Sequence, residues 1–116
     1  TDRLLMALGN HDGCYGDSSG RYKKQFTPER LWQMYFRGQA LDSRRVFSED
    51  GTYFYVDNKA QKTRFIILNS QFGGKYSVDE NGWAVNDRFA VSCYGQEQLD
   101  WLEAQLEKYK DIFWPI

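Results

Sequence analysis

The sequence predicts an α/β protein with a β-hairpin and two helices in this chain. Three observations predict this class. An apolar run at residues 4–8 indicates a buried strand, two segments near the middle have the composition of hairpin strands, and leucines recur at helical spacing near the carboxyl end. The chain has 116 residues, enough for one core, and we expect residues 1–116 to form a single incomplete domain.

The first element is the run Leu4-Leu-Met-Ala-Leu8, which ends at Gly9. Continuous apolar composition is typical of a strand that is buried on both faces. No earlier segment of this chain could pair with it, so we expect a second copy or more of a longer chain to cover it. Self-association through this strand and through a helix at residues 99–106 is one expectation. Residues 9–25 are rich in Gly, Asp and Ser and then basic, which predicts a loop.

A first helix is predicted to start at residues 27–29, Thr-Pro-Glu. Threonine is a good N-cap, proline suits the first helical position, and an acidic side chain favours the first turn. Leu31, Met34 and Tyr35 form one apolar stripe that would face the core. Gly38 is predicted to end this helix.

A short strand is predicted at residues 45–47, followed by a hairpin with arms at 52–57 and 63–69. Both arms are rich in aromatic and branched residues, and the polar residues 58–62 between them predict the turn. Because residues 65–68 show no polar alternation, the second arm is expected to be the more buried one.

Residues 71–94 contain glycines and no clean period, and loops of this length in compact domains are often functional. A second helix is predicted at about residues 96–110. Its apolar face consists of four residues at helical spacing: Leu99, Leu102, Leu106 and Tyr109. Trp101 widens that face, and residues 112–116 resemble the approach to a further element.

Composition excludes several classes of protein. The net charge is −1, so a nucleic-acid partner is not expected, except for a nucleotide as substrate. No apolar run is long enough to cross a bilayer, so no membrane partner is expected. Cys14 and Cys93 are too few for a disulfide framework, and the sequence leaves open whether they pair. This cysteine usage favours a reducing, cytoplasmic location.

Polar groups with catalytic potential follow the first predicted strand directly. Asn10, His11 and Asp12 come after Gly9, and His11 is the single histidine of the chain. The carboxyl ends of strands are where open α/β sheets place their ligands. An asparagine oxygen can bind a metal, a histidine can transfer a proton near neutral pH, and an aspartate can orient the imidazole. A polar turn after a strand is the alternative interpretation.

Residues 5–12, Leu-Met-Ala-Leu-Gly-Asn-His-Asp, resemble a signature block of the calcineurin-like metallophosphoesterases. The segments 53–57 and 63–70 are similar to the hairpin that follows this block in those enzymes. Residues 94–103 are similar to their Gln-x-x-Trp-Leu helix. The three segments occur in the family's order and span most of the chain.

The resemblance implies a four-layer α/β sandwich and a metal-dependent hydrolase, in which two divalent cations hold the attacking hydroxide and phosphate esters are the substrates. The cations would be Mn, Fe, Zn or Mg. Asn10 would be a metal ligand, and His11 would protonate the leaving oxygen or contact the phosphate. Asp12 would hold His11 in the productive tautomer. These implied roles make His11 and Asp12 the candidate catalytic residues.

This chain lacks the other blocks of that family. Asp-x-His and Gly-Asp-x-x-Asp would precede Gly9, and Gly-His-x-His would follow the last helix. One histidine and one asparagine cannot hold two metals. We therefore expect an internal segment of a phosphatase-like enzyme that is inactive alone. The alternative from another class is a non-catalytic interaction module on the same scaffold, with its aromatic loop as the binding surface.

Other patterns are weaker. Residues 16–20 match the Gly-x-Ser-x-Gly motif of serine hydrolases, but the flanks are polar and His11 precedes Ser18, so a loop is favoured. Residues 79–82 begin like a calcium loop but predict a turn. Aromatic and basic residues alternate over 15–26, which could contact a nucleotide, although a solvated loop is favoured. Cys14 lies near His11 and is expected to be a loop residue.

Overall fold

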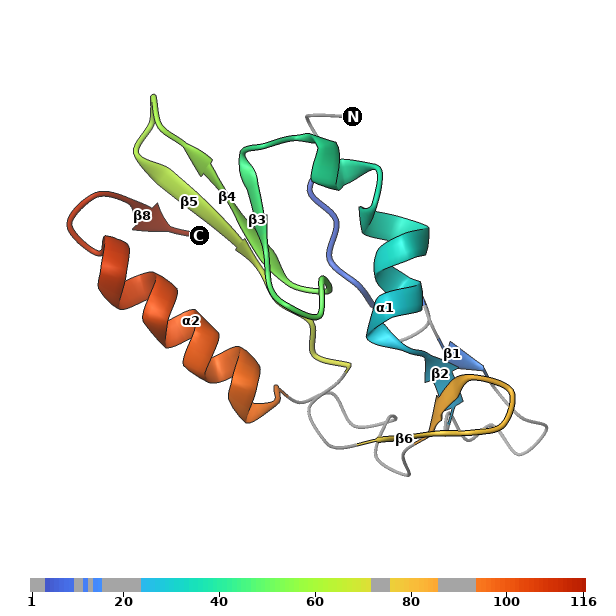
Figure 1. Ribbon diagram of the computed structural model, residues 1–116. Coiled ribbons are helices and arrows are strands. Elements are labelled where there is room, and N and C mark those ends of the chain that lie inside the picture. The colour runs from blue at the N-terminus through green and yellow to red at the C-terminus, as the bar shows by residue number, and fades with distance from the viewer. Residues whose placement is uncertain (1–3, 10–11, 13, 16–23, 72–75, 86–93) are drawn as a thin grey trace.

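The computed structural model describes residues 4–9, 12, 14–15, 24–71, 76–85 and 94–116. These residues form a mixed α/β structure with two four-stranded sheets and two helical regions (Figure 1). In chain order the elements are β1 (Cys14–Tyr15), β2 (Lys24–Phe26), α1 (Pro28–Leu31), the π-helix η1 (Trp32–Phe36), the 3-10 helix η2 (Gln39–Leu41), β3 (Arg45–Phe47), β4 (Phe54–Asn58), β5 (Thr63–Ile67), β6 (Ser77–Val78), β7 (Trp83–Val85), α2 (Gln96–Tyr109) and β8 (Trp114–Pro115). The general α/β class predicted from the sequence is confirmed.

The larger sheet has the strand order β3-β4-β5-β8. Its centre is the predicted hairpin, in which β4 and β5 pair antiparallel from Phe54 opposite Ile67 to Asn58 opposite Thr63. The short strand β3 was also predicted correctly. The last strand, β8, pairs parallel with β5, so the chain end that resembled an approach to a further element is itself an edge strand.

Both faces of this sheet are covered, with α1 and η1 on one side and α2 on the other (Figure 1). Phe54 and Ile67 pack with Leu31 and Phe36 in the core cluster, while Tyr55 on the opposite face contacts α2. The prediction that the second arm is the more buried one is wrong. The first arm has four buried residues, at 52–55, and the second has three, at 64, 67 and 69, while residues 65 and 66 are half-buried. Both strands are sandwiched between the same two helical layers.

The smaller sheet has the order β1-β2-β7-β6, with every pair antiparallel. It joins residues 14–15 and 24–26 to residues 77–85, which the sequence predicted as two loops. The strands have two or three residues each, so none shows a period that a sequence pattern could reveal. The pairing across some sixty residues is what makes them strands.

The apolar run at residues 4–8 is not a strand in the structure, which corrects the first prediction. Leu8 is buried and Met6 packs against the core cluster, but Leu4 and Leu5 are 52% and 38% exposed. The carbonyl oxygen of Leu4 accepts a hydrogen bond from the buried guanidinium of Arg45 at 2.6 Å. The backbone at Leu4 is thus bonded to a side chain, and the run packs against the core cluster through Met6 and Leu8.

The predicted helix start is confirmed. The Thr27 hydroxyl accepts a hydrogen bond from the N–H of Arg30 at 3.4 Å, and Pro28 occupies the first turn. After Leu31 the helix widens into η1, where the N–H of Arg37 donates to the carbonyl oxygen of Trp32 at 2.8 Å. This i→i+5 bond defines π-helical geometry.

The π-helix changes which residues face the core. Leu31 and Phe36, five positions apart, are both fully buried, whereas Met34 of the predicted stripe is 52% exposed. Tyr35 is half-buried at the edge of the cluster. Gly38 does not end the helix in a left-handed conformation, because its φ of −67° continues the right-handed path into η2.

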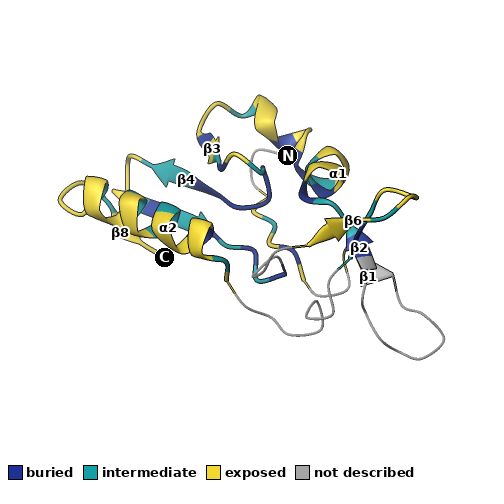
Figure 2. Cartoon of the chain, turned by 60° about the horizontal axis from the view of Figure 1, so that its bottom comes forward, coloured by how far each residue is buried: buried dark blue, intermediate teal, exposed yellow. Residues whose placement is uncertain are grey.

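The second helix, α2, was predicted with nearly correct bounds, but its predicted apolar face is only partly confirmed. Trp101, Leu102 and Tyr109 are half-buried, as that face requires. Gln98 is 5% exposed, while Leu99 and Leu106 are 41% and 38% exposed. Most of α2 is coloured as exposed in Figure 2. The Gln98 side chain accepts a hydrogen bond from the Asn69 N–H at 2.8 Å and donates to the Asn69 carbonyl oxygen at 2.7 Å. These two bonds fix the rotation of the helix, so that Trp101, rather than the leucines at 99 and 106, lies against the sheet.

Candidate functional site

The turn that carries the predicted site is closed between its first and last residues. The backbone N–H of Gly9 donates to Oδ2 of Asp12 at 2.6 Å, and the N–H of Asp12 donates to the carbonyl oxygen of Gly9 at 3.2 Å. A Cβ atom at position 9 would lie 3.3 Å from the same carboxylate oxygen. Glycine therefore suits this position, because a side chain would crowd the carboxylate that closes the turn.

Two contacts hold this turn against the rest of the fold. Leu8, directly before it, is 7% exposed and belongs to the core cluster. The hydroxyl of Tyr35, in η1, donates to the carbonyl oxygen of Asp12 at 2.8 Å. The sequence placed Tyr35 in an apolar stripe and gave no sign of this role, because the hydrogen bond joins residues 23 positions apart.

The predicted site residues are only partly described. Asp12 is described and exposed, whereas Asn10 and His11 lie outside the described residues. The structure assigns one oxygen of Asp12 to the backbone of Gly9. The role of Asp12 in orienting the His11 imidazole, and the role of Asn10 as a metal ligand, stay predictions.

Within the described part of the chain, no three His, Cys, Asp or Glu side chains are grouped so that they could hold a metal ion. Asp12 is thus not part of a complete metal centre formed by these residues. If two cations bind here, the residues at positions 10–12 would contribute to a site that further ligands complete.

A network of buried amide side chains connects three elements of the fold. Asn69 lies just after β5, and its Nδ2 donates to the Thr52 hydroxyl at 3.0 Å, while its Oδ1 accepts from the N–H of Gln71 at 3.0 Å. Gln25 in β2 donates to the carbonyl oxygen of Gln71 at 3.1 Å. Together with Gln98 of α2, these buried side chains link both sheets to the second helix. Sequence reasoning missed this network.

The weaker patterns are resolved where they are described. Residues 79–82 form a turn, as expected, because Oδ1 of Asp79 accepts from the N–H groups of Asn81 and Trp83 and Gly82 has a φ of +79°. Cys14 begins β1, which differs from the predicted loop. The Gly-x-Ser-x-Gly motif at residues 16–20 and Cys93 lie outside the described residues.

The aromatic and basic segment before α1 is also only partly described, and residues 16–23 lie outside the description. Its last aromatic ring, Phe26, stacks on Trp83 with centroids 4.7 Å apart and an interplanar angle of 14°. The guanidinium of Arg30 lies 4.9 Å from the same ring. Phe26 therefore takes part in packing between β2, β7 and α1.

Comparison with known proteins adds no relative. No family model, no curated protein and no solved structure matches this chain. Among the described residues, no helix has the length and apolar character needed to span a membrane.

Proposed function

We propose that this chain carries part of the catalytic centre of a metal-dependent phosphoesterase that hydrolyses phosphate mono- or diesters. The observation that carries the proposal is the turn from Gly9 to Asp12, which is closed by two hydrogen bonds and held by Leu8 and Tyr35. Catalytic groups need fixed positions, since small displacements are costly in rate. Gly9 and Asp12, the first and last residues of the Gly-Asn-His-Asp motif, are the ones held in this way.

Each residue of the motif has a distinct role in this proposal. The amide oxygen of Asn10 is a ligand for a hard divalent cation. His11 donates a proton to the leaving oxygen of the ester, since an imidazole titrates near neutral pH. Asp12 fixes the turn through Gly9 and orients His11. A bound pair of divalent metals would neutralise charge on the phosphoryl oxygens and activate the attacking water.

The complete domain in this proposal is a four-layer α/β sandwich. The arrangement of α1, the larger sheet and α2 supports a layered architecture, because one sheet lies between two helical layers (Figure 1). Further chain would add the remaining layers and the remaining metal ligands. The turnover activity would then belong to the full protein, and the 116 residues alone would be inactive.

The proposal is tested by measuring turnover in the protein that carries this chain. The purified protein is stripped with a chelator, and hydrolysis of p-nitrophenyl phosphate and bis-p-nitrophenyl phosphate is followed with and without added Mn²⁺. We expect turnover of at least one ester that disappears on stripping and returns with the metal. Turnover that is equal with and without metal would contradict the proposal. So would metal-dependent turnover by residues 1–116 alone, because it would show that no further ligands are needed.

The second candidate is a non-catalytic interaction module on the same scaffold. The exposure of large apolar side chains favours it, with Trp114 and Ile116 at the chain end 77% and 73% exposed. Large apolar residues exposed together often mark contact surfaces. Failure of both esters to turn over in a metal-loaded, folded protein would favour this candidate over the enzyme.

A further inference from the structure

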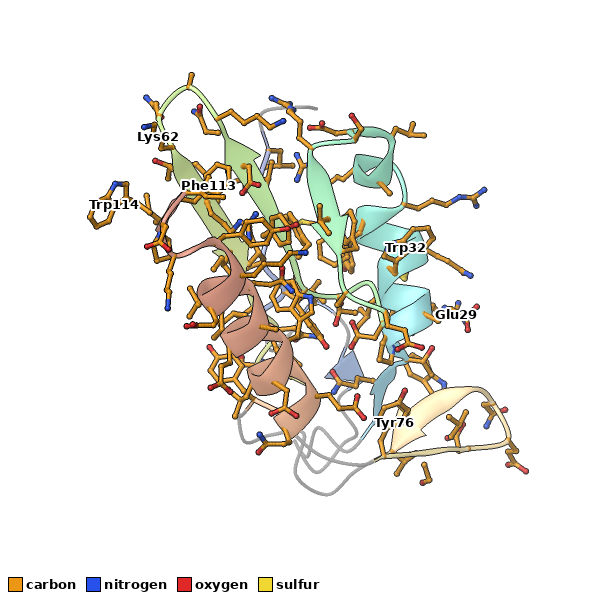
Figure 3. All side chains as sticks on the ribbon, turned by 60° about the vertical axis from the view of Figure 1, so that its left-hand side comes forward. Glu29, Trp32, Lys62, Tyr76, Phe113 and Trp114 are labelled. Carbon is orange, nitrogen blue, oxygen red and sulfur yellow. The ribbon has the colours of Figure 1, made fainter. Side chains whose placement is uncertain are left out.

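A cavity of about 540 Å³ opens between the first helical turn and the turn after β3. It is lined by Pro28, Glu29 and Trp32, by residues 47–51, and by Tyr76 just before β6. Figure 3 shows Glu29 and Trp32 on the same helical stretch and Tyr76 on the separate segment that leads into β6. Its volume lies within the range of small-molecule sites, which is roughly 300–1,000 Å³.

Three of the described side chains that line this cavity are aromatic, those of Trp32, Phe47 and Tyr76, and the backbone of a neighbouring residue restricts the Trp32 ring. Gly51 has a φ of +76°, and a Cβ atom there would lie 2.2 Å from Cδ1 of Trp32. The glycine backbone is thus in direct contact with the indole, which limits how the ring can turn. Phe47 is held by Phe54, with ring centroids 4.7 Å apart.

Among the described residues that line the cavity, the charged ones are all acidic. They are Glu29, Glu49 and Asp50, and these described lining residues include no lysine, arginine or histidine. Oδ1 of Asp50 is held by the Ser48 hydroxyl at 3.0 Å and by the N–H and hydroxyl of Thr52 at 2.8 and 2.9 Å.

Tyr76 brings a third aromatic side chain to the cavity. Its pKa is raised, first by burial and then by the negative charge of Asp50. The described residues that line the cavity thus combine three aromatic side chains with three carboxylates.

We propose that this cavity binds a small organic cation of the quaternary-ammonium type. Aromatic faces attract such cations through the ring quadrupole, and their alkyl groups fill apolar space that a hydrated metal ion or a primary ammonium would leave wet. The three carboxylates supply opposite charge at the same place. They would repel a phosphate, so this site is separate from the proposed phosphoesterase centre and does not depend on it.

The test uses choline and its uncharged isostere, 3,3-dimethylbutan-1-ol, which has the same shape. Binding is followed by two-dimensional ¹H–¹⁵N NMR of the purified protein at the Trp32 indole N–H and the Gly51 amide. We expect saturable shifts of both signals with choline and an affinity at least about fivefold above that of the isostere, since the charge contributes to attraction by the rings. Equal affinity of the two compounds, or no saturable shift with choline, would overturn the proposal.

Two variants locate the site. Glu29 is exposed, so Glu29→Gln should fold normally, and we expect it to weaken choline binding severalfold while leaving binding of the isostere unchanged. Glu103→Gln, on the exposed side of α2, is the matched control and should bind choline as the unaltered chain does. If both substitutions have the same effect on choline binding, the ligand is not in this cavity.

Discussion

Replacing Arg64 with alanine tests how β5 is joined to α2 and to the chain end. The Arg64 side chain is 3% exposed, and its guanidinium forms two bonds of 2.7 Å with the Asp57 carboxylate on β4. Its central carbon lies 3.7 Å from the ring centroid of Tyr55 and 3.8 Å from that of Tyr109. Burial opposes the charged form, but the hydrogen bonds with Asp57, the negative charge of Asp57 and the phenols of Tyr55 and Tyr109 together outweigh burial, so the pKa of Arg64 lies above its usual value.

The expected cost follows from this environment. Removing one partner of a buried ion pair typically costs about 3–5 kcal/mol, because the other charge is left without its counter-ion. Asp57 is 17% exposed, so water can reach part of the carboxylate and the cost should lie near the lower end of that range. Contact between the guanidinium and each ring adds about 0.5–2 kcal/mol. With both ring contacts, we expect Arg64→Ala to lower the free energy of unfolding by about 4–7 kcal/mol.

The measurement is urea unfolding at pH 7, followed by circular dichroism. Arg44→Ala is the matched control, because Arg44 pairs with Asp42 at 2.8 Å but is 55% exposed. An exposed pair of this kind contributes about 0.2–1 kcal/mol. Arg64→Lys keeps the charge but loses the two-pronged geometry, so its loss should lie between the other two. An Arg64→Ala loss no larger than that of Arg44→Ala would refute the reasoning.

Two further predictions concern the backbone at Gly51 and the rotation of α2. In urea melts, Gly51→Ala should destabilise the protein more than Gly82→Ala does. Both glycines have a positive φ, which costs about 1–2 kcal/mol for another residue. Of these two positions, only Gly51 would bring the added Cβ into a side chain, that of Trp32. Equal losses would show that the indole moves away freely. Gln98→Ala should cost about 1–3 kcal/mol, since it leaves the buried N–H and carbonyl oxygen of Asn69 unpaired, and should exceed Leu99→Ala at a position that is 41% exposed. A larger loss of stability for Leu99→Ala than for Gln98→Ala would instead support the leucine face predicted from the sequence.

Elements with local signals could be predicted from the sequence. The start of α1 depends on adjacent residues, Thr27 and Pro28, whose capping and backbone preferences act within one turn. The β4–β5 hairpin and α2 are long enough to show their composition or period. These elements were predicted correctly because neighbours in sequence determine them.

Features that depend on contacts between distant residues were either missed or predicted wrongly. The widening of the helix into η1 buries Phe36 in place of Met34, and a 3.6-residue period cannot anticipate it. The rotation of α2 follows from the hydrogen bonds of Gln98 with Asn69, 29 residues away. The buried face of a helix is predicted from the positions of its apolar residues. A buried glutamine such as Gln98 is therefore assigned to the exposed face, and the predicted rotation of the helix is wrong.

The candidate site divides in the same way. The turn between Gly9 and Asp12 follows from adjacent residues, and the structure closes it with two hydrogen bonds. Its support by the Tyr35 hydroxyl could not be predicted, because that contact depends on where η1 lies in the fold. The cavity beside Trp32 is also assembled from three separate segments, and its residues carry no common motif.

The central claim is that the Asn10–Asp12 segment belongs to a phosphoesterase centre, and the most direct test compares turnover with metal content in two variants. In the metal-loaded protein that carries this chain, His11→Ala should lower kcat by about 10²–10⁴-fold, as loss of a general acid does, while the bound metal stays nearly constant. Asn10→Ala should instead lower the metal content measured by elemental analysis, because it removes a ligand. Glu103→Gln should change neither quantity. An unchanged kcat in His11→Ala, together with unchanged metal content in Asn10→Ala, would contradict the account.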